Sequence, residues 1–241
     1  MQNIATSLGG VRPSVPGSIA PSSQDIFKLD PQLSYLQLGS EDIMQCKPYF
    51  MEVLANSEAL KSGVTIDYNP QSSGSYKPST GHIEMGPISD PKDPMQLSGQ
   101  VAALAHELSH AKDAHEGRVT ARQMAQLHSP DLQGDTRAMY KTELKAWMVE
   151  ALQSKVSMDA GIQPTTRMKD LVKDLSTTVN KRIELYRSQA SLPQSWGAEK
   201  ILQKTKLEQP LKDAIEYVEK TSISSPEEAE AALKELDRIF A

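Results

Sequence analysis

Two histidines and a glutamate lie close together in the segment VAALAHELSHAK, which spans residues 101–112. Histidine is scarce in this chain, with five in 241 residues. Residues four apart share one face of a helix, one turn above the other. His106 and His110 could therefore direct both imidazoles at one metal ion, and zinc accepts such ligands. Glu107 lies one step round the helix, where it could act as general base toward a water molecule activated by the metal.

The segment around these residues has the apolar spacing of a buried helix. Val101, Leu104, Ala105 and Leu108 recur at intervals of three and four. This pattern predicts a helix that begins near residues 95–98 and ends near residues 115–117. Polar side chains in a buried helix are costly unless they are hydrogen-bonded or bind a metal. The H-E-x-x-H spacing on an apolar helix therefore predicts a metal site with one catalytic Zn²⁺ ion.

A catalytic zinc site needs a third protein ligand, and the sequence offers two sources for it. In the continuation H-E-x-x-H-x-x-G-x-x-H, Asp113 would replace the glycine and Glu116 the final histidine, so we reject this source. The segment TELKAW offers Glu143, with the small Ala146 one turn later to let two helices approach. Glu150 lies on the same face two turns on. It is either the ligand itself or a group that orients an imidazole.

Other polar residues near the motif are weaker candidates. We predict that Asp113 faces solvent rather than holding the second histidine of the motif. Tyr140 and Tyr186 could each donate a hydrogen bond to a developing oxyanion, and the sequence does not choose between them. His82 and His128 are predicted to be surface histidines.

The remaining pattern predicts a mainly α (α+β) fold with a small antiparallel hairpin or sheet before the motif helix. Alternation of β-branched residues predicts a strand over 64–68, and a second short strand over 82–86 follows a turn-rich loop. Helices are predicted over 41–60, interrupted at Pro48, and over 137–161, 165–190, 198–220 and 226–240. Ser225, Pro226 and Glu228 have the pattern of a capping box at the start of the last helix.

Composition limits the domain organisation and the partners. Residues 1–24 carry one charge and are rich in Ser, Pro and Gly, a composition found in type III secretion signals and in plain flexible tails. Residues 1–30 are therefore predicted to be a disordered or loosely packed segment that is similar to a secretion signal. Residues 31–241 are predicted to form a single domain. A net charge of −5 argues against nucleic acid or an anionic membrane as the main partner. No run of about 18 apolar residues is present.

The motif HELSHA together with Glu143-Leu144-Lys145-Ala146 resembles gluzincin-type zinc metallopeptidases, with a zincin-like helical domain. The size, the Ser/Pro-rich start and the single cysteine are most similar to the NleD-type effector peptidases, which bacteria inject into host cells. The resemblance implies zinc on His106, His110 and Glu143, with Glu107 as base. It also implies type III secretion into host cytoplasm, a secretion chaperone for the N-terminal segment, and a host intracellular protein as substrate. NleD-type enzymes cut mitogen-activated protein kinases, which makes such a kinase one candidate.

Two other functions are compatible with the same residues. The chain could be a non-catalytic helical interaction protein in which the motif is accidental or binds metal only structurally. A structural zinc site, however, has four protein ligands, and no cysteine lies near the motif. The third possibility is a zinc hydrolase that acts on a non-peptide substrate.

Overall fold

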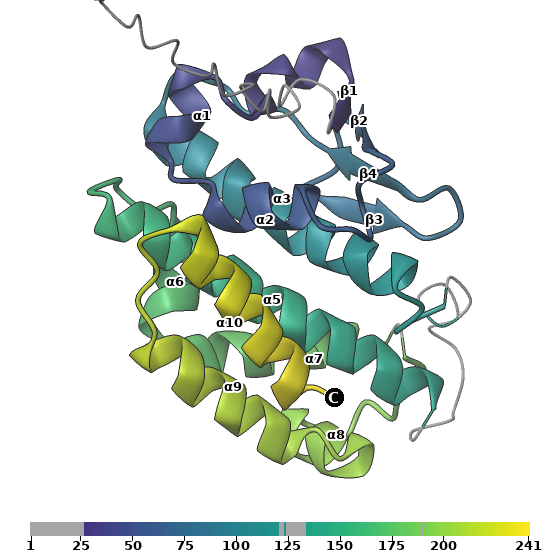
Figure 1. Cartoon of the computed structure of the whole chain (residues 1–241). Coiled ribbons are helices and arrows are strands. Elements are labelled where there is room, and N and C mark those ends of the chain that lie inside the picture. The colour runs from purple at the N-terminus through teal and green to yellow at the C-terminus, as the bar shows by residue number, and fades with distance from the viewer. Residues whose placement is uncertain (1–26, 121–122, 124–133, 189) are drawn as a thin grey trace, which may run out of the picture.

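A small four-stranded sheet and a group of helices enclose helix α3 (Pro94–His115), which carries the histidine motif (Figure 1). The computed structural model describes residues 27–120, 123, 134–188 and 190–241. The strands are β1 (Phe27–Leu29), β2 (Val64–Tyr68), β3 (Ser75–Lys77) and β4 (His82–Met85). The other helices are the 3-10 helix η2 (Pro31–Leu36), α1 (Glu41–Gln45), α2 (Tyr49–Ala55), α5 (Asp135–Asp159), α6 (Thr166–Lys173), α7 (Leu175–Tyr186), α8 (Ala198–Thr205), α9 (Glu208–Lys220) and α10 (Pro226–Ile239). The predicted mainly helical fold with a small sheet is confirmed.

The predicted hairpin is wrong in its pairing. Strands β2 and β4 are parallel neighbours, with Ile66 opposite Ile83. The antiparallel partner of β4 is β3, which lies inside the stretch that we predicted to be a loop. The strand order is β1-β2-β4-β3, so β3 forms one edge of the sheet. Glycine and proline around β3 concealed it, because a three-residue strand leaves little alternation to detect.

The N-terminal boundary also differs from the prediction. Residues 27–29 form strand β1, which pairs in parallel with β2, so the sheet begins inside the range 1–30 that we predicted to be loosely packed. Phe27 is buried against the core. Residues 1–26 lie outside the described part of the chain, and the predictions of a secretion segment and of a chaperone that binds it fall there. No helix among the described residues is long and apolar enough to cross a membrane.

Helix α3 runs between the sheet and helix α5, and packs along α5 over much of its length (Figure 1). Asp93 caps its start by accepting a hydrogen bond from the Met95 amide at 2.9 Å, and Pro94 occupies the first turn. Gly161 follows the end of α5 with a φ of +85°, as the predicted stop requires. Nearly every side chain in the middle of both helices is buried. The motif residues are therefore inside the molecule.

The C-terminal helices cover α5 on the side away from the sheet (Figure 1). Two helices predicted as single segments are each divided in two. Asp174 ends α6 and caps α7, where its side chain accepts from the Thr177 amide at 3.1 Å. Lys206, with a φ of 57°, separates α8 from α9. The predicted cap of α10 is present, since Ser225 accepts from the Glu228 amide at 3.3 Å.

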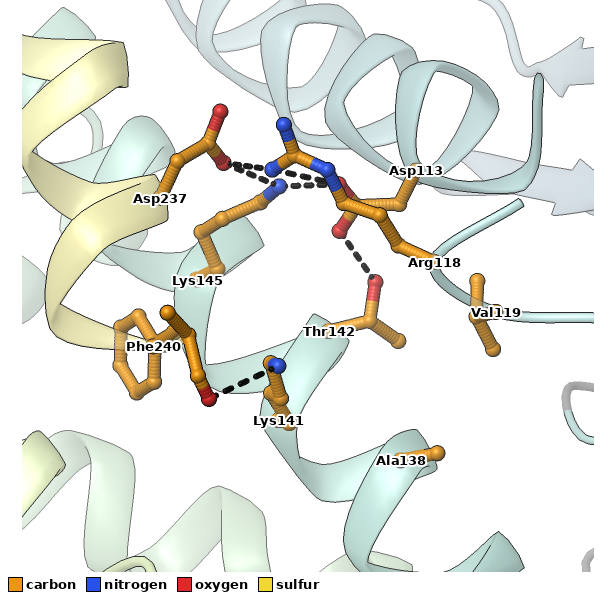
Figure 2. Close-up of a pocket in the computed structure, with 10 residues that line it drawn as sticks. Asp113, Arg118, Val119, Ala138, Lys141, Thr142, Lys145, Asp237 and Phe240 are labelled. Carbon is orange, nitrogen blue, oxygen red and sulfur yellow. Dashed lines mark hydrogen bonds and ion pairs between the residues drawn. The ribbon is translucent and has the colours of Figure 1, made fainter. Parts of the chain in front are cut away.

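A group of charged residues, of which Asp113 and Lys145 are buried, links α10 to the two central helices (Figure 2). Asp237 of α10 accepts from Nζ of Lys145 on α5 at 2.9 Å and also pairs with Arg118, which follows α3. Lys145 pairs in addition with Asp113 of α3. Lys112 also pairs with Asp237, and Glu116 with Arg118, so acids and bases alternate where these segments meet. This pairing allows the charges of Asp113 and Lys145 to be buried near the histidine motif.

Candidate metal centre

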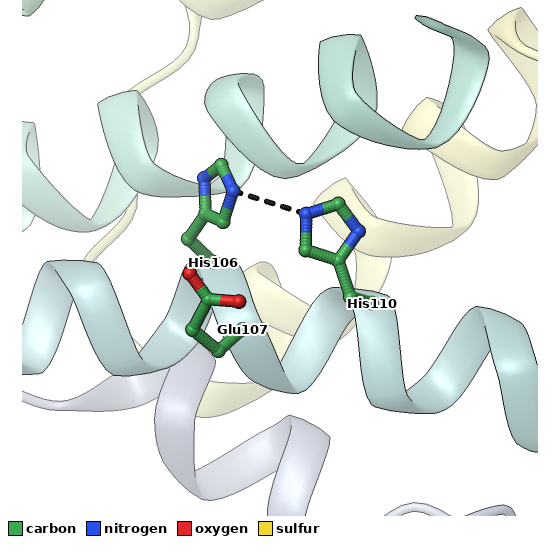
Figure 3. A group of neighbouring side chains, drawn as sticks. All are labelled: His106, Glu107 and His110. Atoms are coloured by element: carbon green, nitrogen blue, oxygen red, sulfur yellow. Dashed lines mark hydrogen bonds between the residues drawn. The ribbon is translucent and has the colours of Figure 1, made fainter. Parts of the chain in front are cut away.

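His106, Glu107 and His110 lie together on the buried middle of α3 (Figure 3). The Nε2 atoms of the two imidazoles point at each other and are 3.1 Å apart. One ligand atom from each of the three residues can be chosen so that all lie within 4.8 Å of one another. Because imidazole and carboxylate are zinc-type ligands, this buried group could hold a metal ion.

The two histidines have different proton affinities. Burial lowers the pKa of His110 well below its usual value, and the charges of His106 and Lys145 lower it further. Burial acts in the same direction on His106, but the carboxylates of Glu150 and Glu107 outweigh it and raise its pKa. His110 is therefore neutral in the folded protein, which is the form that binds a metal.

Helix α5 brings Glu143 to the same point. Its Oε1 lies 3.5 Å from Nε2 of His110, and its Oε2 lies 3.8 Å from Nε2 of His106. With metal bonds of about 2.0–2.2 Å, the ligand atoms of a tetrahedral zinc are about 3.3–3.5 Å apart. The three separations of 3.1, 3.5 and 3.8 Å bracket that value. The 3.5 Å and 3.8 Å separations end on the two different oxygens of Glu143, so the two imidazoles and this carboxylate surround one position that an ion could occupy.

The surroundings of Glu143 also favour the binding of a cation. Burial raises its pKa to about 7, and the nearby Glu107 raises it too, against the lowering effect of His106. Its Oε2 is buried without a hydrogen-bond partner. A buried carboxylate oxygen without a partner is costly, and a cation bound between the histidines would satisfy it.

Glu150 lies two turns farther along α5 and contacts the other side of His106. Its Oε2 is 3.2 Å from Nδ1 of His106, an ion-pair distance, although the two are not aligned as a hydrogen bond. Arg167 donates to its Oε1 at 2.5 Å, and Arg182 donates to its Oε2 at 3.0 Å. Burial would raise the pKa of Glu150, but His106 and Arg167 together lower it well below its usual value. Glu150 is thus a permanent carboxylate behind the imidazole.

Glu107 is held by the edge of the sheet. Its Oε2 accepts from the backbone amide of Tyr76, in β3, at 2.7 Å. Gly74 lies beside it with a φ of +122°, and a Cβ there would come within 3.3 Å of Oε1 of Glu107. Burial raises the pKa of Glu107, while His106 and the Tyr76 amide lower it. Strand β3 therefore fixes the carboxylate that we predicted to be the general base.

A cavity of about 400 Å³ opens on these residues. Its lining comes from β3, from the motif residues of α3, from Thr142 and Glu143 of α5, and from Tyr186 of α7. The hydroxyl of Tyr186 is within hydrogen-bonding reach of Glu143, and its ring packs edge-on against Trp147 at 5.7 Å. Burial and the neighbouring Glu143 raise the pKa of Tyr186, so this hydroxyl keeps its proton.

The second tyrosine candidate serves the fold instead. Tyr140 is fully buried, and its hydroxyl donates to the carbonyl of Ile183 at 3.2 Å. It is absent from the cavity lining. Of the two tyrosines that the sequence left open, Tyr186 alone can face a substrate in the cavity.

The prediction that Asp113 faces solvent is wrong. Asp113 is buried, and its Oδ2 accepts from the Thr142 hydroxyl at 2.9 Å (Figure 2). Oγ1 of Thr142 lies 3.4 Å from Nδ1 of His110. Because Thr142 gives its proton to Asp113, its oxygen is left to accept from Nδ1–H of His110. Asp113 therefore holds this histidine through one intervening hydroxyl, with Nε2 left free for a metal.

His82, which we predicted to be a surface histidine, lies away from the candidate metal centre. His82 is on strand β4, where its Nδ1 is 2.7 Å from Asp67 and its side chain is 41% exposed, as a surface histidine should be. His128 falls outside the described residues. Sequence reasoning missed Thr142, Arg167, Arg182 and the Tyr76 amide. Thr142 stands next to Glu143 in the chain, but no spacing pattern links the two arginines to the motif.

Comparison with models of known protein families, with curated proteins and with solved structures found no match.

Proposed function

We propose that this chain is a zinc-dependent endopeptidase with His106, His110 and Glu143 as the metal ligands. One observation carries the proposal: two imidazole nitrogens and a carboxylate from another helix converge at separations of 3.1–3.8 Å in a buried cavity wall. Three protein ligands leave a fourth position open for solvent or substrate, which is the arrangement of catalytic rather than structural zinc. We assign Glu143 rather than Glu107 as the third ligand because its oxygens lie 3.5 and 3.8 Å from the two imidazole nitrogens, whereas Oε2 of Glu107 accepts from the Tyr76 amide.

The protein groups around this position have complementary tasks. A bound zinc ion would supply Lewis acidity and lower the pKa of water into the neutral range. Glu107, held by Tyr76 and with a raised pKa, accepts a proton from the attacking water and returns it to the leaving amine. Tyr186 remains protonated and donates to the oxygen that becomes negative. Glu150 and Thr142 orient the two imidazoles from behind.

The edge strand β3 favours an extended peptide as substrate over a non-peptide molecule. The Tyr76 amide points away from β4 to reach Glu107, and the amide and carbonyl of one residue point to the same side of an antiparallel strand. The Tyr76 carbonyl is therefore directed outward too, where it can accept from the backbone of an extended chain. This feature favours a peptidase over a hydrolase of non-peptide substrates. A host protein as substrate, including a mitogen-activated protein kinase, remains part of the proposal through the sequence resemblance alone.

The test compares the wild type with Glu107→Gln in a host-cell lysate, with new protein N-termini as the readout. The glutamine keeps the shape of the side chain and an oxygen for the Tyr76 amide, so we expect unchanged folding and zinc content. We expect new termini with the wild type and with the surface control Glu230→Gln, and none with Glu107→Gln. If all three proteins produce the same termini, Glu107 is not the base; if none produces any, the chain is not a peptidase acting on these proteins.

A further inference from the structure

The face of α3 that carries the motif continues beyond it toward the helix N-terminus. Residues 96, 100, 103, 107 and 110 follow one another at intervals of three and four, so they share that face. A second cavity, of about 230 Å³, lies over its N-terminal half. Ser73 borders this cavity and Gly74 borders the cavity at the metal centre, while Ala103 lies one turn before Glu107. The two cavities therefore follow each other along α3 and beside the residues that lead into β3.

The charged residues that line this second cavity are Glu150 and Arg167. Both oxygens of Glu150 already accept from arginines. Arg167 uses only its Nε for Glu150, and its side chain is 47% exposed. Its guanidinium forms no other hydrogen bond within the described part of the chain, so the terminal nitrogens are free to donate. Arg182, which lies outside this lining, also pairs with Glu150, so Arg167 shares that carboxylate with a second guanidinium group.

The rest of the wall fits the stem and backbone of an anionic residue. Ile88, Ala103 and Met168 provide apolar surface. Oε1 of Gln100 is buried without a hydrogen-bond partner and could accept from a substrate amide. A guanidinium with two free nitrogens matches the two oxygens of a carboxylate or of a phosphate.

We propose that the cavity at Arg167 is a substrate subsite for an anionic side chain, so that the enzyme selects peptides with an acidic or phosphorylated residue at one fixed distance from the cleaved bond. The inference rests on the proposed peptidase function. It adds a substrate class that the metal centre alone does not define.

Thr165 allows a test that leaves the metal ligands and Arg167 unchanged. It lines the cavity and caps α6 by accepting from the Met168 amide at 3.2 Å. Asp and Asn are both good N-caps, so Thr165→Asp and Thr165→Asn should keep the helix intact. Only the aspartate introduces a negative charge beside Arg167. This charge would occupy the guanidinium and repel an anionic substrate residue.

The experiment uses synthetic decapeptide libraries in which one position at a time carries Glu, phosphoserine, Gln or Lys. We measure cleavage by the zinc-loaded wild type and by both Thr165 variants. Binding is measured separately, as retention of the same peptides by zinc-loaded Glu107→Gln protein, alone and combined with each Thr165 substitution. The second readout needs no catalysis. We expect Glu or phosphoserine at one position to raise kcat/KM about tenfold over Gln. Thr165→Asp should abolish this preference, and Thr165→Asn should keep it. The Glu and phosphoserine arms show which anion is preferred.

The outcomes separate this inference from the proposed function. If the enzyme cleaves peptides without preferring an anionic residue, the proposed subsite is wrong and the proposed peptidase function stands. The same holds if the preference is equal in Thr165→Asp and Thr165→Asn. If no peptide is cleaved but anionic peptides are retained selectively, and Thr165→Asp removes this retention, the peptidase function is wrong and the subsite is supported. Neither cleavage nor selective retention overturns both. Thermal unfolding of the variants verifies that each is folded.

Discussion

Glu143 and Glu150 lie two turns apart on one helix, yet their surroundings give their carboxyl groups opposite chemistry. Glu143 faces the imidazole nitrogens with one oxygen unpartnered, and burial raises its pKa to about 7. Glu150 faces two arginines and the outer nitrogen of His106, which lower its pKa well below the usual range. A cation bound between the histidines would satisfy the carboxylate of Glu143, whereas Arg167 and Arg182 already pair with that of Glu150.

This difference predicts that Glu143→Gln and Glu150→Gln have opposite effects on zinc affinity and on the stability of the metal-free protein, with zinc affinity more affected by the first and stability by the second. Glu143→Gln should lower zinc affinity at least 100-fold while leaving the metal-free protein as stable as the wild type, since it removes a desolvated acid. Glu150→Gln should destabilise the metal-free protein by about 3 kcal/mol, because it removes the buried carboxylate that pairs with Arg182 and with the half-exposed Arg167. Its effect on zinc affinity should be smaller, about 10- to 100-fold. Chelator competition and urea unfolding measure the two quantities. The reverse order of zinc affinities would exchange the roles of the two residues.

Thr142 gives a sharper test of how His110 is oriented. Thr142→Val removes the hydroxyl between His110 and Asp113 without changing side-chain shape, and we expect zinc affinity to fall about 10- to 100-fold. Thr142→Ser restores the hydroxyl and should restore most of the affinity. The matched control is Thr205→Val, because Thr205 is a buried threonine whose hydroxyl donates within α8 to Ile201. Equal zinc affinity in wild type and Thr142→Val would exclude the hydroxyl bridge.

At the scale of elements, helix α10 contributes to the site without touching the metal ligands. Its Asp237 shares Lys145 and Arg118 with Asp113, which holds His110 through Thr142. Burial would raise the pKa of Asp237, but the hydrogen bonds and charges of Arg118 and Lys145 lower it to about 2. A lowered carboxyl pKa stabilises the folded state above the ordinary value near 4 and loses this contribution as pH falls toward 2.

We therefore expect Asp237→Asn to lower the free energy of unfolding by about 2 kcal/mol at pH 7. The gap between wild type and variant should close as pH falls from 4 to 2, because the wild-type aspartate then takes up a proton. The control is Glu235→Gln, since the ion-pair partner of Glu235 among the described residues is the exposed Arg238. Denaturant titrations across this pH range measure the gap. A gap that stays constant down to pH 2 would contradict the assigned ion pairs.

The elements differ in how well the sequence predicts them. Helices α3 and α5 were predictable because each presents a long apolar repeat with a stop signal, such as Gly161 after α5. The pairing of the sheet was not, because β1 and β3 have three residues each and parallel partners leave no turn signature. That error matters for function, since the missed strand β3 holds Glu107 through the Tyr76 amide.

At the scale of the whole molecule, the site forms where segments distant in sequence converge on α3. Strand β3 approaches from the sheet, α5 and α7 supply Glu143 and Tyr186 from the helical side, and α6 supplies Arg167 (Figure 1). The motif predicted the two histidines and the glutamate between them because their spacing is local. Thr142, Arg167 and Arg182 depend on tertiary packing, which no spacing in the sequence records.

This burial makes metal binding depend on pH. In the metal-free protein the pKa of Glu143 is raised to about 7, so its proton stabilises the fold at low pH, and this contribution is lost as pH rises from 4.5 to 7. Zinc must displace that proton, and also any proton on His106, whose pKa is raised as well. We expect zinc affinity, and the rise in Tm that zinc causes, to increase with pH up to about 7. Chelator competition from pH 5.5 to 8 measures this, and an affinity that does not change across the range would contradict it.

Anomalous diffraction at the zinc absorption edge, from crystals grown with zinc, tests the central claim most directly. We predict one strong peak within about 2.0–2.2 Å of Nε2 of His106, Nε2 of His110 and an oxygen of Glu143, with the fourth position open to the cavity. Glu150 should remain on Nδ1 of His106. The absence of a peak between the imidazoles, or a peak bonded by Glu150 in place of Glu143, would contradict the proposed metal centre.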